Sequence, residues 1–252
     1  RDHIRANRPE LLLGLDAAAQ EEVFKRTYNE VAREFWERSL RECQRVRPNA
    51  SFGFYGMPLR QYAQLFGQRR TPSYQEINDQ ELAWLFAAQD AMFPSIYSMH
   101  KIEPGGWRPD RPPGRMFETE SEIYVRGNVR EAERVAQGKP VLPFVWPRYH
   151  QNAGAQYSGT LVDDLSLRHQ LEFPKEEGAE GVMIWDSIRT PEQFEELQGY
   201  LDSMLTPMAR RVHSYTERSQ GGSGGAGGSG SGGSSSGSGS GPTSGASLRG
   251  AS

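Results

Sequence analysis

Three aromatic side chains, Tyr55, Tyr97 and Trp185, lie at the ends of short apolar segments that recur along the sequence. A tyrosine hydroxyl can donate and accept hydrogen bonds, and an indole offers a large apolar face together with one N–H donor. In parallel β/α proteins the chemistry is placed at the C-terminal ends of the strands. The pattern therefore predicts that these three side chains stand where a substrate binds.

Each residue also has a plainer interpretation. Read alone, Tyr55 favours packing in the core or at its rim, and the indole of Trp185 fills the mouth of a barrel as readily as it stacks on a sugar. Tyr97 ends the string Pro94-Ser95-Ile96-Tyr97, which favours a functional role.

The segments that carry this pattern lie roughly 40 residues apart, with helix-like sequence between them, as in β/α repeats that build parallel sheets and barrels. Four strands do not close a barrel, which needs about eight. The first predicted helix also has no strand before it. We therefore expect an α/β fold that is either a small open sheet or the C-terminal part of a barrel. The predicted strands are residues 51–56, 93–97, 141–146 and 181–185.

Five predicted helices separate and follow these strands. In the first, Phe24, Tyr28, Val31 and Phe35 are spaced four, three and four residues apart and form one apolar stripe. A proline at position 174 is expected to kink or shorten the fourth helix. The predicted helices are residues 17–46, 77–91, 119–137, 163–177 and 190–215.

Composition limits the domain count and the class of partner. Of the 252 residues, those from 221 to 241 are almost entirely Gly and Ser, which cannot bury a core. We expect one folded domain over residues 1–219 and a disordered tail over 220–252. The formal net charge of −3 offers no basic field for nucleic acid, and no apolar run is long enough for a transmembrane helix. Cys43 is predicted to be a small core residue.

Several strings in the sequence resemble motifs of the animal hyaluronidases, in order, from about residue 1 to residue 213. Residues 51–58 are similar to the family's Trp-Gly-Phe-Tyr-x-x-Pro, and residues 78–86 to its Asn-Asp-Gln-Leu-x-Trp-Leu-Trp helix. The strand at 91–97 resembles Ala-Leu-Tyr-Pro-Ser-Ile-Tyr, and residues 140–144 resemble Leu-Pro-Val-Leu-Pro-Tyr. Residues 178–185 resemble Gly-Ala-Ala-Gly-Val-Val-Leu-Trp.

The resemblance implies the C-terminal part of a distorted (β/α) TIM-type barrel that lacks its N-terminal strands. It also implies cleavage of hyaluronan, and sometimes chondroitin, in which a protonated Glu assists attack by the substrate's own acetamido oxygen. Tyr55 and Tyr97 match tyrosines that hold the acetamido group and sugar hydroxyls. Trp185 matches the tryptophan beside the acetamido methyl, and Ser95 neighbours the same cleft. No cofactor is implied, and the family points to an extracellular or lysosomal protein.

Two departures from the family pattern bear on activity. The family's Asp-x-Glu pair lies on a strand before the long first helix, and this sequence has no such strand, so we expect the chain alone to be inactive. The family's Pro-Asp-Cys-Tyr-Asn reads Pro58-Leu59-Arg60-Gln61-Tyr62, without the carboxylate and the cysteine. The missing part is also expected to leave a strand edge unpaired and an apolar face uncovered, so that the chain associates.

Other ionisable groups are weaker candidates. A general-acid role is not favoured for Asp186 or Glu103, nor for the acidic pairs and repeats at helix starts, Glu118-x-Glu120-x-Glu122 and Asp163-Asp164, which suit the helix dipole. His100 and His150 lack a third ligand, so no zinc site is expected. The loop residues Arg108, Arg111 and Arg115 are either solvated or, as we predict, contacts for glucuronate carboxylates.

Three functions remain open from the sequence. The first is a glycoside hydrolase acting on a glycosaminoglycan, and the second is a non-catalytic relative that binds polysaccharide through the same tyrosines and tryptophan. The third is an unrelated barrel enzyme with another small substrate. An Asp-x-Glu pair on an upstream strand would separate the first from the second, and oligosaccharide binding at the aromatic cluster would exclude the third.

Overall fold

The computed structural model of the chain describes residues 1–60, 73–105 and 115–212. The chain divides into two units, Arg1–Ser214 and Tyr215–Ser252. The second unit lies outside the described residues, so the domain boundary near residue 220 and the disordered tail stay predictions. Within the described part, no helix is both long enough and apolar enough to cross a bilayer.

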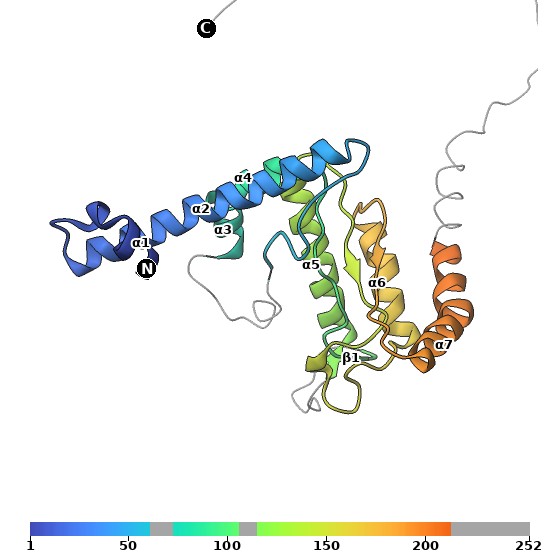
Figure 1. Ribbon diagram of the computed structural model, residues 1–252. Coiled ribbons are helices and arrows are strands. Elements are labelled where there is room, and N and C mark those ends of the chain that lie inside the picture. The colour runs from blue at the N-terminus through green and yellow to red at the C-terminus, as the bar shows by residue number, and fades with distance from the viewer. Residues whose placement is uncertain (61–72, 106–114, 213–252) are drawn as a thin grey trace, which may run out of the picture. The chain divides into compact units, whose positions relative to one another are not determined.

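Helices dominate the first unit, and its strands are very short (Figure 1). The last helical stretch continues through residues 206–212. The elements are α1 (Asp2–Asn7), η1 (Pro9–Leu12), α2 (Ala17–Val46), α3 (Tyr74–Gln80), α4 (Ala83–Ala88), β1 (Lys101–Glu103), β2 (Arg115–Phe117), α5 (Glu118–Ala136), β3 (Phe144–Val145), η3 (Gln151–Ala153), α6 (Asp164–Glu176), β4 (Met183–Ile184), α7 (Pro191–Tyr200) and the π-helix η4 (Leu201–Leu205).

The four segments predicted as strands lie next to one another in chain order. β3 and β4 pair in parallel, with Phe144 opposite Met183. Residues 92–96 bind residues 140–144 through four backbone hydrogen bonds of 2.8–3.1 Å, and Tyr55 forms a parallel bridge with Phe93. The predicted order and direction are therefore confirmed. The regular strands are much shorter than predicted, and the described residues do not close a barrel.

Side chains replace the strand ladder along residues 51–56. The Asp90 carboxylate accepts from the Phe52 N–H at 2.9 Å, and the Gln89 amide oxygen accepts from the Phe54 N–H at 2.5 Å. Two backbone bonds complete the attachment, from the Asp90 N–H to the Phe52 carbonyl at 2.7 Å and from the Gly56 N–H to the Phe93 carbonyl at 2.9 Å. Because two of the four contacts use side-chain acceptors, this segment lies beside its neighbour without forming a regular strand.

Two elements differ from the sequence prediction. The predicted helix 77–91 is two helices, α3 and α4, and the segment that leads to residue 93 is extended from Gln89 onward. The predicted loop after Tyr97 contains the parallel pair β1 and β2, in which Ile102 lies opposite Met116. α6 continues to Glu176, so Pro174 lies in its last turn and does not shorten it.

The motif Asn-Asp-Gln at the end of α3 has a structural role. Asn78 is fully buried, and its side chain binds both the N–H and the carbonyl of Leu59 at 3.1 and 3.0 Å. Its amide also donates to Glu131 of α5 at 2.7 Å. Asp79 accepts from Arg134 of α5 at 2.8 Å. These contacts fix α3 and the chain after the first segment against α5.

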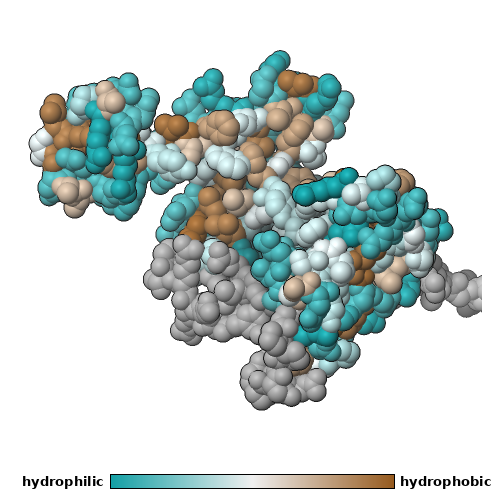
Figure 2. Space-filling view, turned by 60° about the horizontal axis from the view of Figure 1, so that its bottom comes forward, coloured by the Kyte–Doolittle hydropathy of each residue, from teal (hydrophilic) through white to brown (hydrophobic). Residues whose placement is uncertain are grey.

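The apolar stripe of α2 is largely exposed to solvent. Phe24 is buried, but Tyr28 is 73% exposed and Phe35 is 67% exposed. Cys43, predicted to be a core residue, is exposed as well, and this prediction was wrong. Figure 2 shows that hydrophobic surface on the face turned to the viewer lies in patches among hydrophilic groups.

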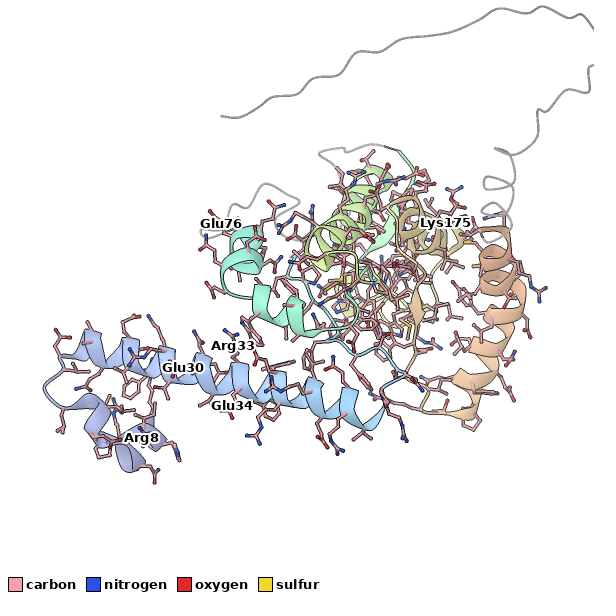
Figure 3. All side chains as sticks on the ribbon, turned by 90° about the horizontal axis from the view of Figure 1, so that it is seen from above. Arg8, Glu30, Arg33, Glu34, Glu76 and Lys175 are labelled. Carbon is pink, nitrogen blue, oxygen red and sulfur yellow. The ribbon has the colours of Figure 1, made fainter. Side chains whose placement is uncertain are left out.

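Contacts between α2 and the rest of the unit come from another side of the helix. Gln44 donates to the Ala88 carbonyl at 3.2 Å, and the Arg33 guanidinium lies 5.2 Å from the Trp84 ring of α4. Glu30, Arg33 and Glu34 are labelled along α2 in Figure 3. Trp36 and Leu40 lie on the same side as these residues: the Trp36 ring meets the Phe54 ring at 4.0 Å and Leu40 is buried. The predicted apolar stripe lies on the opposite side of α2 and is left facing water.

Two buried clusters form the core. One packs the central segments against α5 and includes Met92, Ile96, Val129 and Val141, each fully buried. The other joins the loop after β3 to α6 and the last helices. Lys175 of α6, labelled in Figure 3, also donates to the Val212 carbonyl at 2.5 Å. The second cluster comprises Tyr149, Ala153, Val162, Leu167, Leu171, Tyr200, Leu205 and Met208.

Gly53 is predicted to be essential for the attachment of the first segment. A Cβ at this position would lie 2.5 Å from the Ala91 carbonyl oxygen and 2.8 Å from the Phe93 ring. We expect Gly53→Ala to lower the free energy of unfolding by about 1–3 kcal/mol, as for other overpacked sites. Gly199→Ala on α7 is the control, because a Cβ there meets nothing within 4 Å. Equal stability of the two variants in urea unfolding would contradict the close approach.

Candidate active site

Tyr55, Tyr97 and Trp185 come together at one end of the paired segments. The Tyr55 and Tyr97 rings are stacked with their centroids 5.8 Å apart, and the centroids of Tyr97 and Trp185 are 6.0 Å apart. The Trp185 indole N–H donates to the Tyr97 hydroxyl. Tyr55 and Trp185 are 52% and 39% exposed, whereas Tyr97 is buried. The predicted convergence is therefore present, with Tyr97 beneath two accessible rings.

The Tyr97 hydroxyl is held in its neutral form. Burial, together with the hydrogen bond that it shares with Tyr55, raises the pKa of Tyr97 well above its ordinary value. Because the Tyr55 hydroxyl donates to Ser95, Tyr97 gives its own proton to Tyr55 while it accepts from Trp185. Tyr97 therefore hydrogen-bonds a ligand oxygen only by exchanging Tyr55 for it, and it does not act as a base.

Ser95 lies beside the cluster, as predicted, and contacts it directly. Its hydroxyl accepts from the Tyr55 hydroxyl at 3.1 Å, and its carbonyl accepts from the Tyr124 hydroxyl of α5 at 3.3 Å. Ser95 also forms a parallel bridge with Phe144. These contacts place Ser95 where it orients the exposed Tyr55 ring.

Two further aromatic residues of the cluster had no predicted role. The Phe144 ring meets the Tyr55 ring edge-on at 5.2 Å, and the Trp146 ring stacks on Trp185 at 5.8 Å with an interplanar angle of 12°. The signal for Trp146 was present in the sequence, because it ends the third apolar segment just as Tyr97 ends the second. Together the five rings make a continuous aromatic surface across all four segments.

The predicted arginine contacts are only partly described. Arg108 and Arg111 lie outside the described residues. Arg115, at the start of β2, forms an ion pair with Glu103 of β1 and donates to the Tyr157 hydroxyl. Its guanidinium also lies 4.7 Å from the Tyr157 ring. A role in binding substrate carboxylates stays a prediction for all three, and for Arg115 the pairing with Glu103 weighs against it.

The weaker carboxylate candidates near this end of the molecule are engaged by other groups. Asp186 accepts from Trp146 at 2.7 Å and from Arg148 at 2.8 Å, and its side chain is 4% exposed. Glu103 pairs with Arg115, and Asp163 accepts from Lys101 and from the N–H of Ser166, which it caps. The remaining acidic residues begin α5, where Glu118 approaches Arg168 and His169, Glu120 accepts from the Phe117 N–H, and Glu122 pairs with Arg126.

Histidine residues do not form a metal centre in the described part of the chain, where no group of three or more His, Cys, Asp or Glu could hold an ion. The His150 ring accepts from the Asn152 N–H at 3.2 Å and caps η3. Burial lowers the pKa of His150 below its ordinary value, which keeps the ring neutral for this contact.

Comparison with known proteins gives matches to hyaluronidases. Residues 3–223 match the family model described as hyaluronidase. Hyaluronidase of Apis mellifera is 28% identical over 203 residues, which cover 76% of this chain and 48% of that protein. Hyaluronidase-1 of Homo sapiens is 28% identical over 211 residues, covering 79% and 43%. The chain spans about half the length of these relatives.

Solved structures give the same result. Bee venom hyaluronidase superposes with a TM-score of 0.63 at 26% identity, covering 82% of this chain and 62% of that one. The same enzyme in complex with a hyaluronic acid tetramer gives 0.62 at 25% identity, covering 83% and 61%. The parallel segments and their helices thus have the fold of part of a glycoside hydrolase barrel. The chain belongs to the hyaluronidase family.

The ion pair between Lys101 and Asp163 predicts an acid-dependent loss of stability beside the site. Burial acts to raise the pKa of Asp163, but the contacts with Lys101 and Ser166 outweigh it and lower this pKa below its ordinary value of 3.8. The contribution of Asp163 to the free energy of unfolding is therefore fully present above pH 3.8. It is lost as the pH falls through the lower pKa that Asp163 has in the folded protein. We expect Asp163→Asn to lower the Tm at neutral pH, since Asn keeps the helix cap but not the charge.

The measurement is the Tm of both proteins from neutral pH down to about pH 2. The difference between them should shrink as the pH falls below 3.8. Asp164→Asn is the matched control, because Asp164 is the exposed neighbour in the same helix turn. A difference that grows at low pH would contradict the assignment.

Proposed function

We propose that the chain supplies the part of a hyaluronidase-type active site that recognises the acetamido group, for cleavage of hyaluronan by a substrate-assisted retaining mechanism. The observation that carries the proposal is the convergence of Tyr55, Tyr97 and Trp185 at the end of the parallel segments. Membership of the hyaluronidase family gives this cluster its chemical context. A glycosaminoglycan is accordingly the proposed substrate.

In such a mechanism the acetamido oxygen of the substrate attacks the anomeric carbon while a carboxylic acid gives its proton to the leaving oxygen. The acetamido group becomes positively charged as the new bond forms, and it must be held in one orientation to react. Tyr97 can bind it through a neutral hydroxyl whose position is set by Trp185. The accessible face of Trp185 offers a surface for the acetamido methyl, and the exposed Tyr55 hydroxyl can bind a sugar hydroxyl.

Proton donation is the step that this cluster does not perform in our proposal. The carboxylates weighed as candidates, Asp186 and Glu103 above all, are paired with arginines, and an adjacent guanidinium favours the ionised form of a carboxyl group. We propose that the donor belongs to an Asp-x-Glu segment upstream of Arg1. The pairing of Asp186 and Glu103 with arginines also supports a second candidate function, a protein that binds the polysaccharide without cleaving it.

The chain alone is expected to bind a hyaluronan tetrasaccharide and to leave hyaluronan uncut, because Asp186 and Glu103, the candidate acids among the described residues, are paired with arginines. Binding is followed by tryptophan fluorescence and cleavage by the release of reducing ends. Adding the upstream segment, fused or as a separate piece, should restore cleavage. Depolymerisation by residues 1–220 alone would show that the acid lies within them, and Glu103 and Asp186 would be the first residues to substitute.

Tyr97→Phe tests the proposed role of the hydroxyl in a form of the protein that includes the Asp-x-Glu segment. We expect kcat to fall on the order of 10²-fold, as when a preorganised hydrogen-bond donor is removed, with little change in Tm. Tyr74→Phe is a control for loss of a buried tyrosine hydroxyl away from the cluster. Unchanged turnover at saturating substrate would remove Tyr97 from the mechanism.

A further inference from the structure

We propose that Asp186 and Arg148 are positioning residues that fix the stacked pair of indoles, Trp146 and Trp185, in the orientation that binds a sugar. The inference rests on the proposed function and extends it, since neither residue touches the substrate in our assignment. Three contacts among these side chains carry it, together with the place of Trp185 at the end of an edge strand.

Asp186 is surrounded by donors. One carboxylate oxygen accepts from the Trp146 indole N–H at 2.7 Å and from the Ser187 N–H at 2.8 Å. The other oxygen accepts from the Arg148 Nε at 2.8 Å. A carboxylate that accepts on both oxygens cannot rotate without breaking these bonds. Asp186 therefore holds the Trp146 ring through the indole N–H, the one polar group of that side chain.

Arg148 connects this carboxylate to the rest of the fold. Its side chain is only 8% exposed, and Nη1 donates to the Gly159 carbonyl at 3.1 Å and to Glu196 of α7 at 2.8 Å. The guanidinium is planar, so the two bonds that hold Nη1 set the direction in which Nε points toward Asp186. The orientation of Asp186 is thus set from two elements that lie outside the aromatic cluster.

Trp185 needs such support because the strand that carries it is short and open on one side. β4 contains only Met183 and Ile184, each 41% exposed, and it pairs with β3 alone among the described strands. The last backbone bond, from the Trp185 N–H to the Val145 carbonyl, is 3.3 Å long. Stacking on Trp146 and the bond to Tyr97 then hold the indole itself.

The stacked indoles provide a specific spectroscopic signal. Two indoles whose centroids are 5.8 Å apart couple their electronic transitions, and the sign and size of the resulting exciton couplet in far-ultraviolet circular dichroism follow the angle between the transition moments of the two rings. The couplet reports ring geometry, whereas the Tm reports stability. The two readouts therefore separate a positioning role from a purely structural one.

Asp186→Asn is the first test, in the chain as it stands. The amide has one acceptor oxygen where two donors, Trp146 and Arg148, need one each, so the ring orientation should be lost. We expect the couplet to weaken by at least half and the Kd for a hyaluronan tetrasaccharide to rise by about tenfold. Glu195→Gln, an exposed change on α7, is the control and should alter neither.

Asp186→Asn leaves Arg148 as an uncompensated buried charge and can unfold the protein, so a second variant is required. Arg148→Met combined with Asp186→Leu removes both charges and retains apolar volume, which often preserves stability. This folded double variant should show the same loss of couplet and of affinity. An intact couplet with wild-type affinity, or unfolding of both variants, would overturn the positioning role.

Failure of the proposed function would be visible separately. If the wild-type chain shows the couplet but binds no hyaluronan tetrasaccharide, the assignment of the substrate is wrong. The role of Asp186 and Arg148 in setting the indole pair is then decided by the couplet alone, and its loss in the folded double variant supports that role.

Discussion

Parallel pairing between residues 92–96 and 140–144 is the interaction on which the rest of the described fold depends. Both segments are bonded to each other through their backbones, and their inward side chains, among them Met92, Ile96 and Val141, are fully buried against α5. Residues 52–57 lie on the outer side of the segment 92–96, and β4 pairs with β3 on the outer side of the other segment. A one-residue slip in the central pair would turn every inward side chain outward and separate Tyr97 from Trp185.

The sequence predicted the arrangement of the site better than the form of its elements. Tyr97 and Trp185 are 88 residues apart, yet their placement at the ends of repeated apolar segments was enough to bring them together. The irregularity of residues 51–56 could not be predicted, because it depends on which backbone groups Gln89 and Asp90 reach. The exposure of Cys43 was missed for a similar reason: periodicity identifies the apolar side of a helix and not what lies against it.

Two groups of exposed apolar side chains lie at the two ends of the row of segments. At one end is the stripe of α2, where Tyr28, Val31 and Phe35 are each more than 60% exposed, and at the other are the side chains of β4 and Phe194 of α7. In a closed barrel the first and last strands pair with each other, so no edge remains. Among the described residues β4 has no second partner, which leaves a row of backbone donors and acceptors open beside apolar side chains. Such an edge combines the two features that promote association.

The chemical role open to a carboxylate near the aromatic cluster depends on the charges that lie beside it. A buried carboxylate next to a guanidinium is stabilised as an anion, and one in apolar surroundings holds its proton. Asp186 lies in surroundings of the first kind, because Arg148 and the Trp146 N–H both donate to it. A group of this kind can hold rings in place throughout a reaction but has no proton to give. Substrate-assisted cleavage at this cluster therefore requires a carboxyl group of the second kind, one that approaches the accessible faces of Tyr55 and Trp185 without an arginine beside it.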